Sequence, residues 1–432
     1  ANAIMLIQNH HMKVLIISNI ELDTKKARGN TYANWLSNWE DTQIACIYSR
    51  GTYPNNDFCD EYFSISPFNI IRDCWKPWNI GRYFTRKEIP QNNSSVSQRE
   101  RGLIQKSKHQ DRRWIYLAID LLFKSHIWMN RRYKNFVRDF NPDIVFFFAK
   151  SDAFLMENLK YIKKHTSARC VAFYADDVYR RFQNQKGLIY RIFEKRFPKI
   201  IKLADAHLGA SILMCEDYGK LFGIKMTPFY KGCEISDTSN NINAPIKIVY
   251  AGNLYYGREE TLYKIAAAMN QINKETEHIR LDIYTSAEIT EDIDKNLNIQ
   301  GTSQILGAKP YEEIKQIMSD ADIVLHVESF LEKNIKSVRL SYSTKISDCL
   351  QSGSLLLAIG PRNIASIEEA LTIPGAVTIT DENEILAGLK DIVSNRIDIP
   401  KKAALTNQYA KEHFPIDIVR RKLKSLFTNL TK

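Results

Sequence analysis

Short runs of apolar residues alternate with amphipathic helical stretches along most of this chain, and the pattern occurs twice. The first series of predicted strands covers residues 13–18, 42–48, 143–149, 169–175, 206–210 and 225–230, and the second covers 246–252, 279–285, 303–308, 322–327, 354–360 and 376–380. Continuous apolar runs are typical of strands buried on both faces of a parallel sheet. The sequence therefore predicts an α/β protein built from two doubly wound, Rossmann-like sheets.

The length of 432 residues favours two domains, because a single hydrophobic core rarely grows that large. The polar stretch 236–245 ends in a proline and is typical of a linker. We therefore expect domains at 12–235 and 246–400, with C-terminal helices over 401–432 that pack back on the first domain. Open α/β sheets bind ligands beyond the carboxyl ends of their strands, so two such domains are expected to face a cleft that holds the site.

Positive charge is concentrated in residues 72–135, which hold fifteen Lys or Arg and five Asp or Glu and so carry +10 of the net charge of +11. Such a segment indicates an anionic surface or polymer as partner and argues against a globally basic nucleic-acid binder. The apolar stretch 114–129 within it predicts a helix lying in an anionic membrane interface or, alternatively, a core helix with a solvated basic end. No run of 18 apolar residues is present to span a bilayer.

The seven cysteines form no C-x-x-C pair, which favours a reducing compartment over a disulfide framework or a zinc site. The first residues lack the charged and long apolar regions of a signal peptide, and Met5 or Met12 is a natural start. We therefore expect a cytoplasmic protein that can lie on the inner face of the membrane.

Two loops of the second half suit phosphate groups. Gly252 and Asn253 follow a predicted strand, and Arg258 opens the next helix. Glycine lets backbone N–H groups approach a ligand closely, and arginine can hold a phosphate through two hydrogen bonds. The alternative is an ordinary loop with a surface arginine.

The second loop begins the helix of the stretch SYSTKISDCLQSG, residues 341–353. Ser343, Thr344 and Lys345 offer hydroxyls, backbone N–H groups and a cation at a helix N-terminus, which favours an anion there. Asp348 lies one turn further on, where a carboxylate can accept hydrogen bonds from ribose hydroxyls. The alternative is that the hydroxyls only cap the helix and the charges are solvated.

Several motifs carry a resemblance in their order along the chain. They are RGNTYANWLSNW (28–39), NPDIVFFF (141–148), ADAHLGASILMCEDYGKLFG (204–223), KGCEI (231–235), AGNL (251–254), ILGAKPYEEI (305–314), ADIVLHVES (321–329) and STKISDCLQSGSLLLAIGP (343–361). In this order they resemble glycosyltransferase family 4, which has the GT-B fold. The resemblance implies transfer of a sugar, with retention of configuration, from a UDP- or GDP-linked donor to a carbohydrate acceptor. We expect the acceptor to be lipid-linked, as in surface polysaccharide synthesis.

The resemblance also assigns residues. Asp348 matches a glutamate that contacts the donor ribose, whereas the glutamate expected eight residues upstream, which contacts the donor sugar, is Leu340 here. Glu328 and Glu332 are the candidates to replace it, and we take Glu328 as a catalytic candidate. Gly29 and Asn30 resemble the glycine loop that faces the acceptor.

Asp176 and Asp177 follow a predicted strand and are catalytic candidates that could orient an acceptor hydroxyl, although helix capping is the commoner role of such residues. His326 ends another strand and is expected to be a core histidine. Asp292 and Asp294 form a D-x-D pattern in a polar stretch, where a surface position is favoured. We expect no metal and no cofactor, because cationic side chains and helix ends can stabilise a leaving diphosphate.

Two other functions stay open. One is a sugar-nucleotide 2-epimerase of the same fold, which needs no acceptor. The other is a catalytically silent partner subunit, which the leucine at position 340 keeps in view.

Overall fold

The structure is a computed structural model that describes residues 11–50, 53–90, 113–183, 185–237, 242, 244–340, 344–394 and 396–432. The chain forms two compact units. Unit 1 comprises Ala1–Leu208, Ile224–Met226 and Arg420–Lys432, and unit 2 comprises Gly209–Gly223 and Thr227–Val419.

The first sheet has the strand order β4-β3-β2-β1-β5-β6-β7-β8. Its strands are β1 Met12–Ser18, β2 Thr42–Tyr48, β3 Glu61–Ser64, β4 Arg82–Thr85, β5 Ile144–Phe148, β6 Arg169–Tyr174, β7 Ala206–Gly209 and β8 Thr227–Pro228. The pairs β2–β3, β1–β2, β1–β5 and β5–β6 are parallel, and β4 runs antiparallel to β3. Parallel pairing puts the carboxyl ends of these strands at one edge of the sheet.

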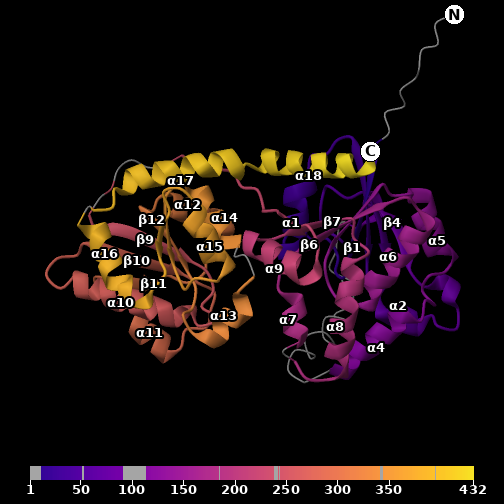
Figure 1. Cartoon of the computed structure of the whole chain (residues 1–432), viewed down its shortest axis with the longest axis horizontal. Helices are drawn as coiled ribbons and strands as arrows, with labels where there is room; N and C mark the ends of the chain where they lie inside the picture. Colours follow the sequence, from indigo (N-terminus) through magenta and orange to yellow (C-terminus); the bar gives the residue numbers. More distant parts are fainter. Residues whose placement is uncertain are drawn as a thin grey trace, which may run out of the picture. The chain divides into compact units, whose positions relative to one another are not determined.

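Helices cover both faces of this sheet (Figure 1). They are α1 Ala27–Leu36, α2 Pro67–Arg72, α4 Arg113–Lys124, α5 Arg131–Phe140, α6 Ala153–His165, α7 Val178–Gln183 and α8 Leu188–Ile201, with short 3-10 turns η1 Pro77–Asn79 and η2 Arg86–Glu88. The core under α1 is aromatic: the Trp35 ring lies 4.7–6.1 Å from the rings of Phe146, Phe148 and Phe173. Such packing fixes α1 on the sheet through large buried apolar surfaces.

The second sheet has the order β11-β10-β9-β12-β13-β14 and is parallel throughout. Its strands are β9 Ile246–Ala251, β10 Ile279–Tyr284, β11 Ser303–Ile305, β12 Ile323–Val327, β13 Leu355–Ile359 and β14 Val377–Ile379. The helices of unit 2 are α9 Ile212–Phe222, α10 Arg258–Ile272, α11 Glu291–Leu297, α12 Tyr311–Ser319, α13 Glu332–Val338, α14 Thr344–Ser352, α15 Ala365–Thr372, α16 Ile385–Val393 and α17 Ile399–His413, with the 3-10 turn η5 Glu382–Glu384.

Alternate residues of β9 face opposite layers of unit 2. Ile248 belongs to the apolar cluster that contains α10 and α16 residues, and Val249 belongs to the cluster that contains α14 and α15 residues. The central strands β9, β12 and β13 contribute to both clusters and are thus covered on both faces, which is the physical reason for their apolar sequences. The prediction of two Rossmann-like sheets is confirmed.

The described parts of the segment 72–135, residues 72–90 and 113–135, belong to the fold and were only partly predicted. They supply β4, whose Arg82 pairs with Ser64 of β3, and neither strand was predicted. They also supply α4, where the buried Asp120 forms an ion pair with the buried Arg196 of α8 at 2.6 Å.

The prediction of one helix over 114–129 is wrong. Helix α4 ends at Lys124, and the buried Trp128 turns back to donate its indole N–H to the carbonyl of Phe123 at 2.8 Å. The alternative prediction, a helix that belongs to the core, therefore holds for the end of the stretch at Phe123 and Trp128. Trp114 and Leu121 on α4 are exposed.

The compact units also differ from the predicted boundaries. Helix α9 clusters with unit 2, because Asp217 forms an ion pair with Arg339 at 2.9 Å and α9 packs against α15. Helix α17 packs on β13 of unit 2. Helix α18, Ile416–Thr431, belongs to unit 1 from Arg420 onward, where Arg420 donates to the carbonyl of Asn34 at 2.9 Å.

Candidate functional site

The carboxyl edge of the second sheet brings Gly252 and Lys345 into contact. Gly252 follows β9, and a Cβ atom added to it would lie only 1.8 Å from Nζ of Lys345, in the first turn of α14. Lys345 Nζ donates to the Tyr250 hydroxyl at 3.4 Å and lies 5.1 Å from the centre of that ring. A glycine at position 252 is therefore what lets the lysine reach the exit of β9.

Lys345 is an unusual cation because its charge has no close partner. Within the part of the chain that the structure describes, no carboxylate lies within 4 Å of its ammonium group. Burial, and then the positive charge of Arg258, lowers the pKa of Lys345 to about 8. A partly buried cation without a carboxylate partner is stabilised by an anion that binds beside it.

Arg258, at the start of α10, is held by a network of buried hydrogen bonds. Its guanidinium donates to both oxygens of Glu328 at 2.9 and 3.0 Å, to Asn253 Oδ1 at 3.0 Å and to the carbonyl of Val327 at 3.2 Å. Glu328 is 2% exposed and also accepts a hydrogen bond from Ser366 at 3.3 Å. These bonds fix the arginine, and the Glu328 carboxylate acts as its positioning partner.

The protonation of this network follows from its burial. Burial alone would raise the pKa of Glu328, but the His326 ring and the Arg258 guanidinium lower it to about 2. Burial also lowers the pKa of His326, whose ring nitrogens form no hydrogen bond among the described residues although Nε2 lies 3.4 Å from Glu328. The His326 ring and the Arg258 guanidinium thus both favour the ionised form of Glu328, and Arg258 also donates to both of its oxygens.

Asp348 lies one turn beyond Thr344 on α14 and faces Tyr311 at the start of α12, whose hydroxyl donates to it at 3.4 Å. Burial raises the pKa of Asp348, and the nearby charge of Lys231 opposes that shift. Burial also raises the pKa of Tyr311 to about 12. The tyrosine ring and the carboxylate thus border the same side of α14 as Lys345.

The sequence also singled out Ser343, Thr344, Leu340 and Glu332. Ser343 and the side chain of Thr344 lie outside the described residues. Leu340 is fully buried, and its carbonyl accepts a hydrogen bond from Ser211 at 3.5 Å. Glu332 is exposed on α13 and pairs with Lys336 at 2.7 Å, so Glu328 is the acid nearer to Arg258.

In unit 1 the structure gives Gly29 a packing role. It lies buried in the first turn of α1, where an added Cβ would come within 2.1 Å of the carbonyl oxygen of Asp23. Asn30 follows it on the exposed side of the helix. The loop that precedes α1 therefore closes tightly on the helix.

Asp176 and Asp177 follow β6 at the carboxyl edge of the first sheet. Asp177 accepts from the backbone N–H and the guanidinium of Arg180, both at 3.2 Å, which is the capping geometry of the α7 N-terminus. Asp176 is exposed and close enough to Lys150 to act on its pKa.

Lys150 and Arg50 are residues that sequence reasoning missed. Lys150 comes two residues after β5, and Arg50 two residues after β2, so both stand at the same edge as Asp176. Burial, and then the positive charge of Arg28, lowers the pKa of Lys150 to about 8. The sequence could have indicated both residues by their position, because each is the first charged residue after an apolar strand.

Asp292 and Asp294 are exposed on α11 and bond to Tyr263 and Asn298. Residues two apart on a helix point in different directions, so these two do not converge on one ion. Among the described residues no group of three or more His, Cys, Asp or Glu is arranged to hold a metal. All seven cysteines are free thiols. No helix in the described ranges has both the length and the apolar character to cross a membrane.

Comparison with known proteins identifies the fold. No family model and no curated protein matches the chain. Among solved structures, Anabaena HepE in complex with UDP is 10% identical with a TM-score of 0.62, over 97% of this chain and 100% of that one. Sucrose-phosphate synthase from Thermosynechococcus elongatus is 10% identical, with a TM-score of 0.61 over 97% and 99%. The trehalose 6-phosphate synthase of Burkholderia multivorans is 8% identical, with a TM-score of 0.58 over 98% and 97%.

These structures belong to the GT-B glycosyltransferases. This chain has the same fold over nearly its whole length, and the expected fold class is confirmed.

Proposed function

We propose that this protein is a glycosyltransferase that moves a sugar from a nucleotide diphosphate donor to a carbohydrate acceptor. The observation that carries the proposal is Lys345, a partly buried ammonium group without a carboxylate partner in the described structure, placed beside a glycine at the carboxyl end of β9. A diphosphate there would receive a charge-assisted hydrogen bond from the lysine and the favourable dipole of α14. UDP or GDP is the expected nucleotide.

The rest of the donor fits the neighbouring residues. Asp348 is the acceptor for ribose hydroxyls, and Tyr311 offers a ring beside it. Arg258 is a positioned cation behind Gly252 and Asn253, held by Glu328. As the diphosphate leaves, these cations stabilise its growing negative charge without a metal or other cofactor.

The acceptor side rests on the first sheet. Asp176 and Lys150 stand at its carboxyl edge, and Asp176 is the candidate to orient an acceptor hydroxyl. The proposed acceptor is lipid-linked, and the proposed product keeps the anomeric configuration of the donor. The protein would then work in the cytoplasm at the inner face of a membrane.

The first test is a thermal-shift screen of nucleotide sugars with the full chain. A UDP- or GDP-linked sugar should raise the melting temperature, because ligand binding to the folded state stabilises it. No shift with any of them would contradict the proposal. The stereochemistry of the product, followed by NMR of the anomeric proton, then tests retention.

Product analysis separates the rival functions. A 2-epimerase would convert a nucleotide sugar without any acceptor, whereas the proposed transferase would leave the donor unepimerised. A catalytically silent partner subunit would form no product with any donor and acceptor. The observation that favours this function is the buried Leu340, which stands where glycosyltransferase family 4 has a glutamate.

A further inference from the structure

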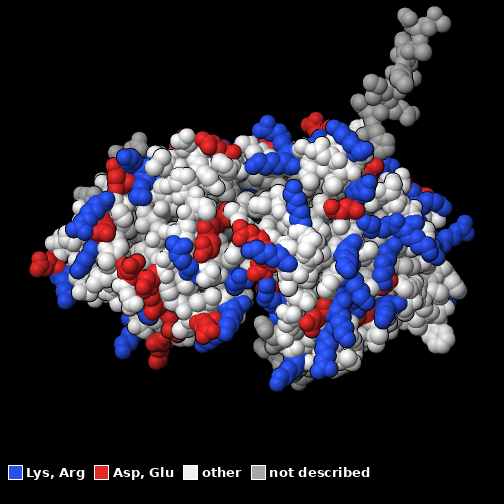
Figure 2. Space-filling view, viewed as in Figure 1, with Lys and Arg blue, Asp and Glu red and all other residues white. Residues whose placement is uncertain are grey.

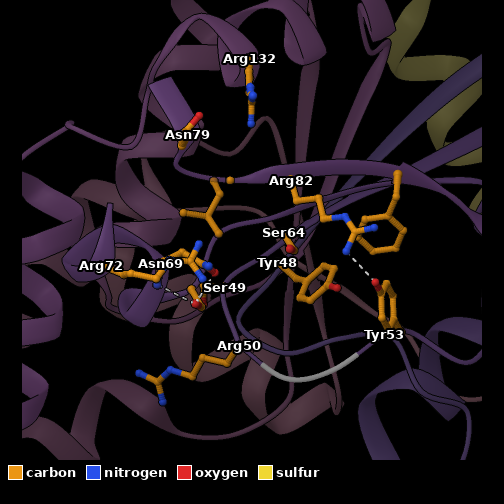
Figure 3. A pocket seen from close by; sticks show the side chains of 14 residues that line it. Tyr48, Ser49, Arg50, Tyr53, Ser64, Asn69, Arg72, Asn79, Arg82 and Arg132 are labelled. Carbon is orange, nitrogen blue, oxygen red and sulfur yellow. Dashed lines mark hydrogen bonds between the residues drawn. The ribbon is translucent and has the colours of Figure 1, made fainter. Parts of the chain in front are cut away.

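Unit 1 contains a cavity of about 560 Å³ that the donor site does not use. It lies where β2 and β3 end and the antiparallel β4 begins, and Ser64 and Arg82 are paired across its floor. Figure 3 shows its 14 lining side chains, which come from these strands, from α2 and η1, and from α5.

The lining of this cavity is cationic. Arg50, Arg72, Arg82 and Arg132 all line it, and none of the described lining residues is Asp or Glu. Arg72 already pairs with Asp73 at 2.6 Å. Among the described residues the other three form no ion pair with a carboxylate, and Arg82 donates to the Tyr53 hydroxyl at 2.6 Å (Figure 3). Like charges gathered around one cavity repel each other unless an anion lies among them.

Neutral hydrogen-bonding groups complete the lining. Polar side chains that also line the cavity are Tyr48, Ser49, Ser64, Ser66, Asn69 and Asn79. The hydroxyl of Ser49 donates to the carbonyl of Asn19 at 3.2 Å, and the hydroxyl of Ser66 donates to Asn69 Oδ1 at 2.5 Å. Guanidinium groups bind phosphoryl oxygens through paired hydrogen bonds, and the side-chain amides of Asn69 and Asn79 suit the remaining oxygens. Three guanidinium groups without a carboxylate partner suit a diphosphate ligand better than they suit a ligand with a single carboxylate.

The segment that lines the cavity also exposes large apolar side chains. Phe68 and Ile71 of α2 are 55% and 59% exposed, Trp75 is 89% exposed, and Trp78 of η1 is 60% exposed. We call these four residues the apolar rim. They alternate along the chain with the lining residues Asn69, Arg72 and Asn79, so one short segment presents cations to the cavity and apolar groups to the solvent.

Aromatic residues beside basic ones are the composition of surfaces that lie in a membrane interface. Basic side chains also predominate over unit 1 on the face shown in Figure 2. An apolar rim beside a diphosphate-sized cationic cavity matches the two ends of a lipid diphosphate.

From these observations we propose that the cavity binds the diphosphate group of a lipid-linked acceptor and that the apolar rim lies in the membrane interface beside the lipid. This inference rests on the proposed function and specifies its acceptor. No covalent step occurs in the cavity; it holds the acceptor while transfer takes place at the sugar.

The test of the cavity uses inorganic pyrophosphate and calorimetry, with UDP present at saturation so that the donor site is filled. Pyrophosphate should bind, and the double variant Arg50→Ala/Arg132→Ala should weaken that binding at least tenfold. Arg131→Ala, an exposed neighbour on α5 that does not line the cavity, is the matched control and should bind as the wild type does. Equal affinities in all three proteins would overturn the inference.

The affinity of the double variant for UDP separates this inference from the proposed function. It should be unchanged, because the donor residues lie in unit 2. If UDP binds and pyrophosphate does not, the cavity assignment fails and the transferase proposal stands. If UDP fails to bind the wild-type protein, the transferase proposal fails first.

The lipid is tested with zwitterionic vesicles that carry a long-chain isoprenoid diphosphate. The variant Trp75→Ser/Trp78→Ser should lose most of its vesicle binding but keep its affinity for free pyrophosphate. Leu188→Ser, an exposed apolar residue of α8, serves as the control. Undiminished vesicle binding by the tryptophan variant would overturn the lipid part of the inference.

Discussion

At the residue scale, Lys345 and Arg258 are two cations with opposite arrangements. Arg258 is buried and donates four hydrogen bonds, two of which form its ion pair with Glu328. Lys345 has only the Tyr250 hydroxyl and ring as described partners. A paired cation supports the structure around it, whereas an unpaired one is free to bind an external anion.

Replacing the unpaired lysine tests its role directly. Lys345→Ala should weaken UDP binding at least several-fold, because a charge-assisted hydrogen bond contributes roughly 1.5–3 kcal/mol. Titration calorimetry measures the change, and Lys336→Ala, which removes an exposed lysine of the same unit, is the control. An affinity that stays the same in Lys345→Ala would exclude this residue from the donor site.

The pKa of Lys345 predicts a pH dependence for the same measurement. Because burial and Arg258 lower the pKa of Lys345 to about 8, the lysine is charged below that pH and loses its proton above it. A bound phosphate favours the charged form, so the association constant should be steady below pH 8 and fall by up to about tenfold per pH unit above it. Lys345→Met should show no such fall beyond that caused by the nucleotide itself.

The paired arginine predicts a loss of stability instead. Arg258→Met leaves the Glu328 carboxylate buried and uncompensated, which should lower the free energy of unfolding by about 3–5 kcal/mol. Urea unfolding of the full chain measures this. The double variant Arg258→Met/Glu328→Leu should recover part of the loss, and a double variant as unstable as the single one would contradict the charge argument.

The Glu328 carboxyl gives this stability a pH dependence with a defined sign. Its folded-state pKa is about 2, below the ordinary value of 4.5, so its contribution is present above pH 4.5 and is lost as the pH falls toward 2. The difference in unfolding free energy between wild type and Glu328→Gln should therefore shrink by about 1 kcal/mol between about pH 5 and pH 3.5.

At the element scale, the described parts of the segment 72–135 contain both buried core residues and exposed apolar residues, which the sequence does not separate. Strand β4 and the buried side chains of Asp120, Phe123 and Trp128 belong to the core of unit 1. The exposed Trp114 and Leu121 of α4 face away from that core. Helices α2 and α4 pack against each other, so their exposed apolar residues lie on neighbouring elements.

This arrangement predicts moderate, reversible and salt-sensitive binding to anionic membranes. Basic side chains near an anionic leaflet contribute about 1 kcal/mol each, and salt screens that attraction. In co-sedimentation, the protein should pellet with anionic vesicles at low salt and less at high salt, and not with zwitterionic vesicles. A protein that stays in the supernatant throughout would make the segment purely structural and favour a soluble acceptor.

At the scale of the whole molecule, the chain contains two largely parallel sheets, and polar residues follow the carboxyl ends of the strands in both. In unit 2 those ends carry Gly252, Arg258 and Glu328, and in unit 1 they carry Arg50 and Lys150. The donor and acceptor roles proposed for the two units follow from this difference in residues, because the architecture at the two edges is the same.

A reaction built on these cations needs no metal. Transferase activity should survive EDTA, because Lys345, Arg258 and the α14 N-terminus are proposed to stabilise the leaving diphosphate. The assay compares rates with EDTA, without it and after addition of Mn²⁺. Activity that vanishes with EDTA and returns with Mn²⁺ would contradict this and direct attention to Asp292 and Asp294.

The sequence by itself determined the two parallel sheets, because strands buried on both faces must be apolar throughout, and that pattern is local. It also located the loops at Gly252 and Lys345, since the carboxyl ends of parallel strands meet at one edge. It could not show that a Cβ at position 252 would collide with the Lys345 ammonium, because that contact joins residues far apart in the chain.

The tertiary structure alone decided the rest. The short strands β3 and β4 have little pattern of their own and are fixed by pairing with each other and with β2. The stretch 114–129 has the composition of an interfacial helix, but the burial of Phe123 and Trp128 is set by what packs against them. The arginines of the cavity come from separate segments, and only folding brings their charges together, since electrostatic interactions depend on distance in space and not along the chain.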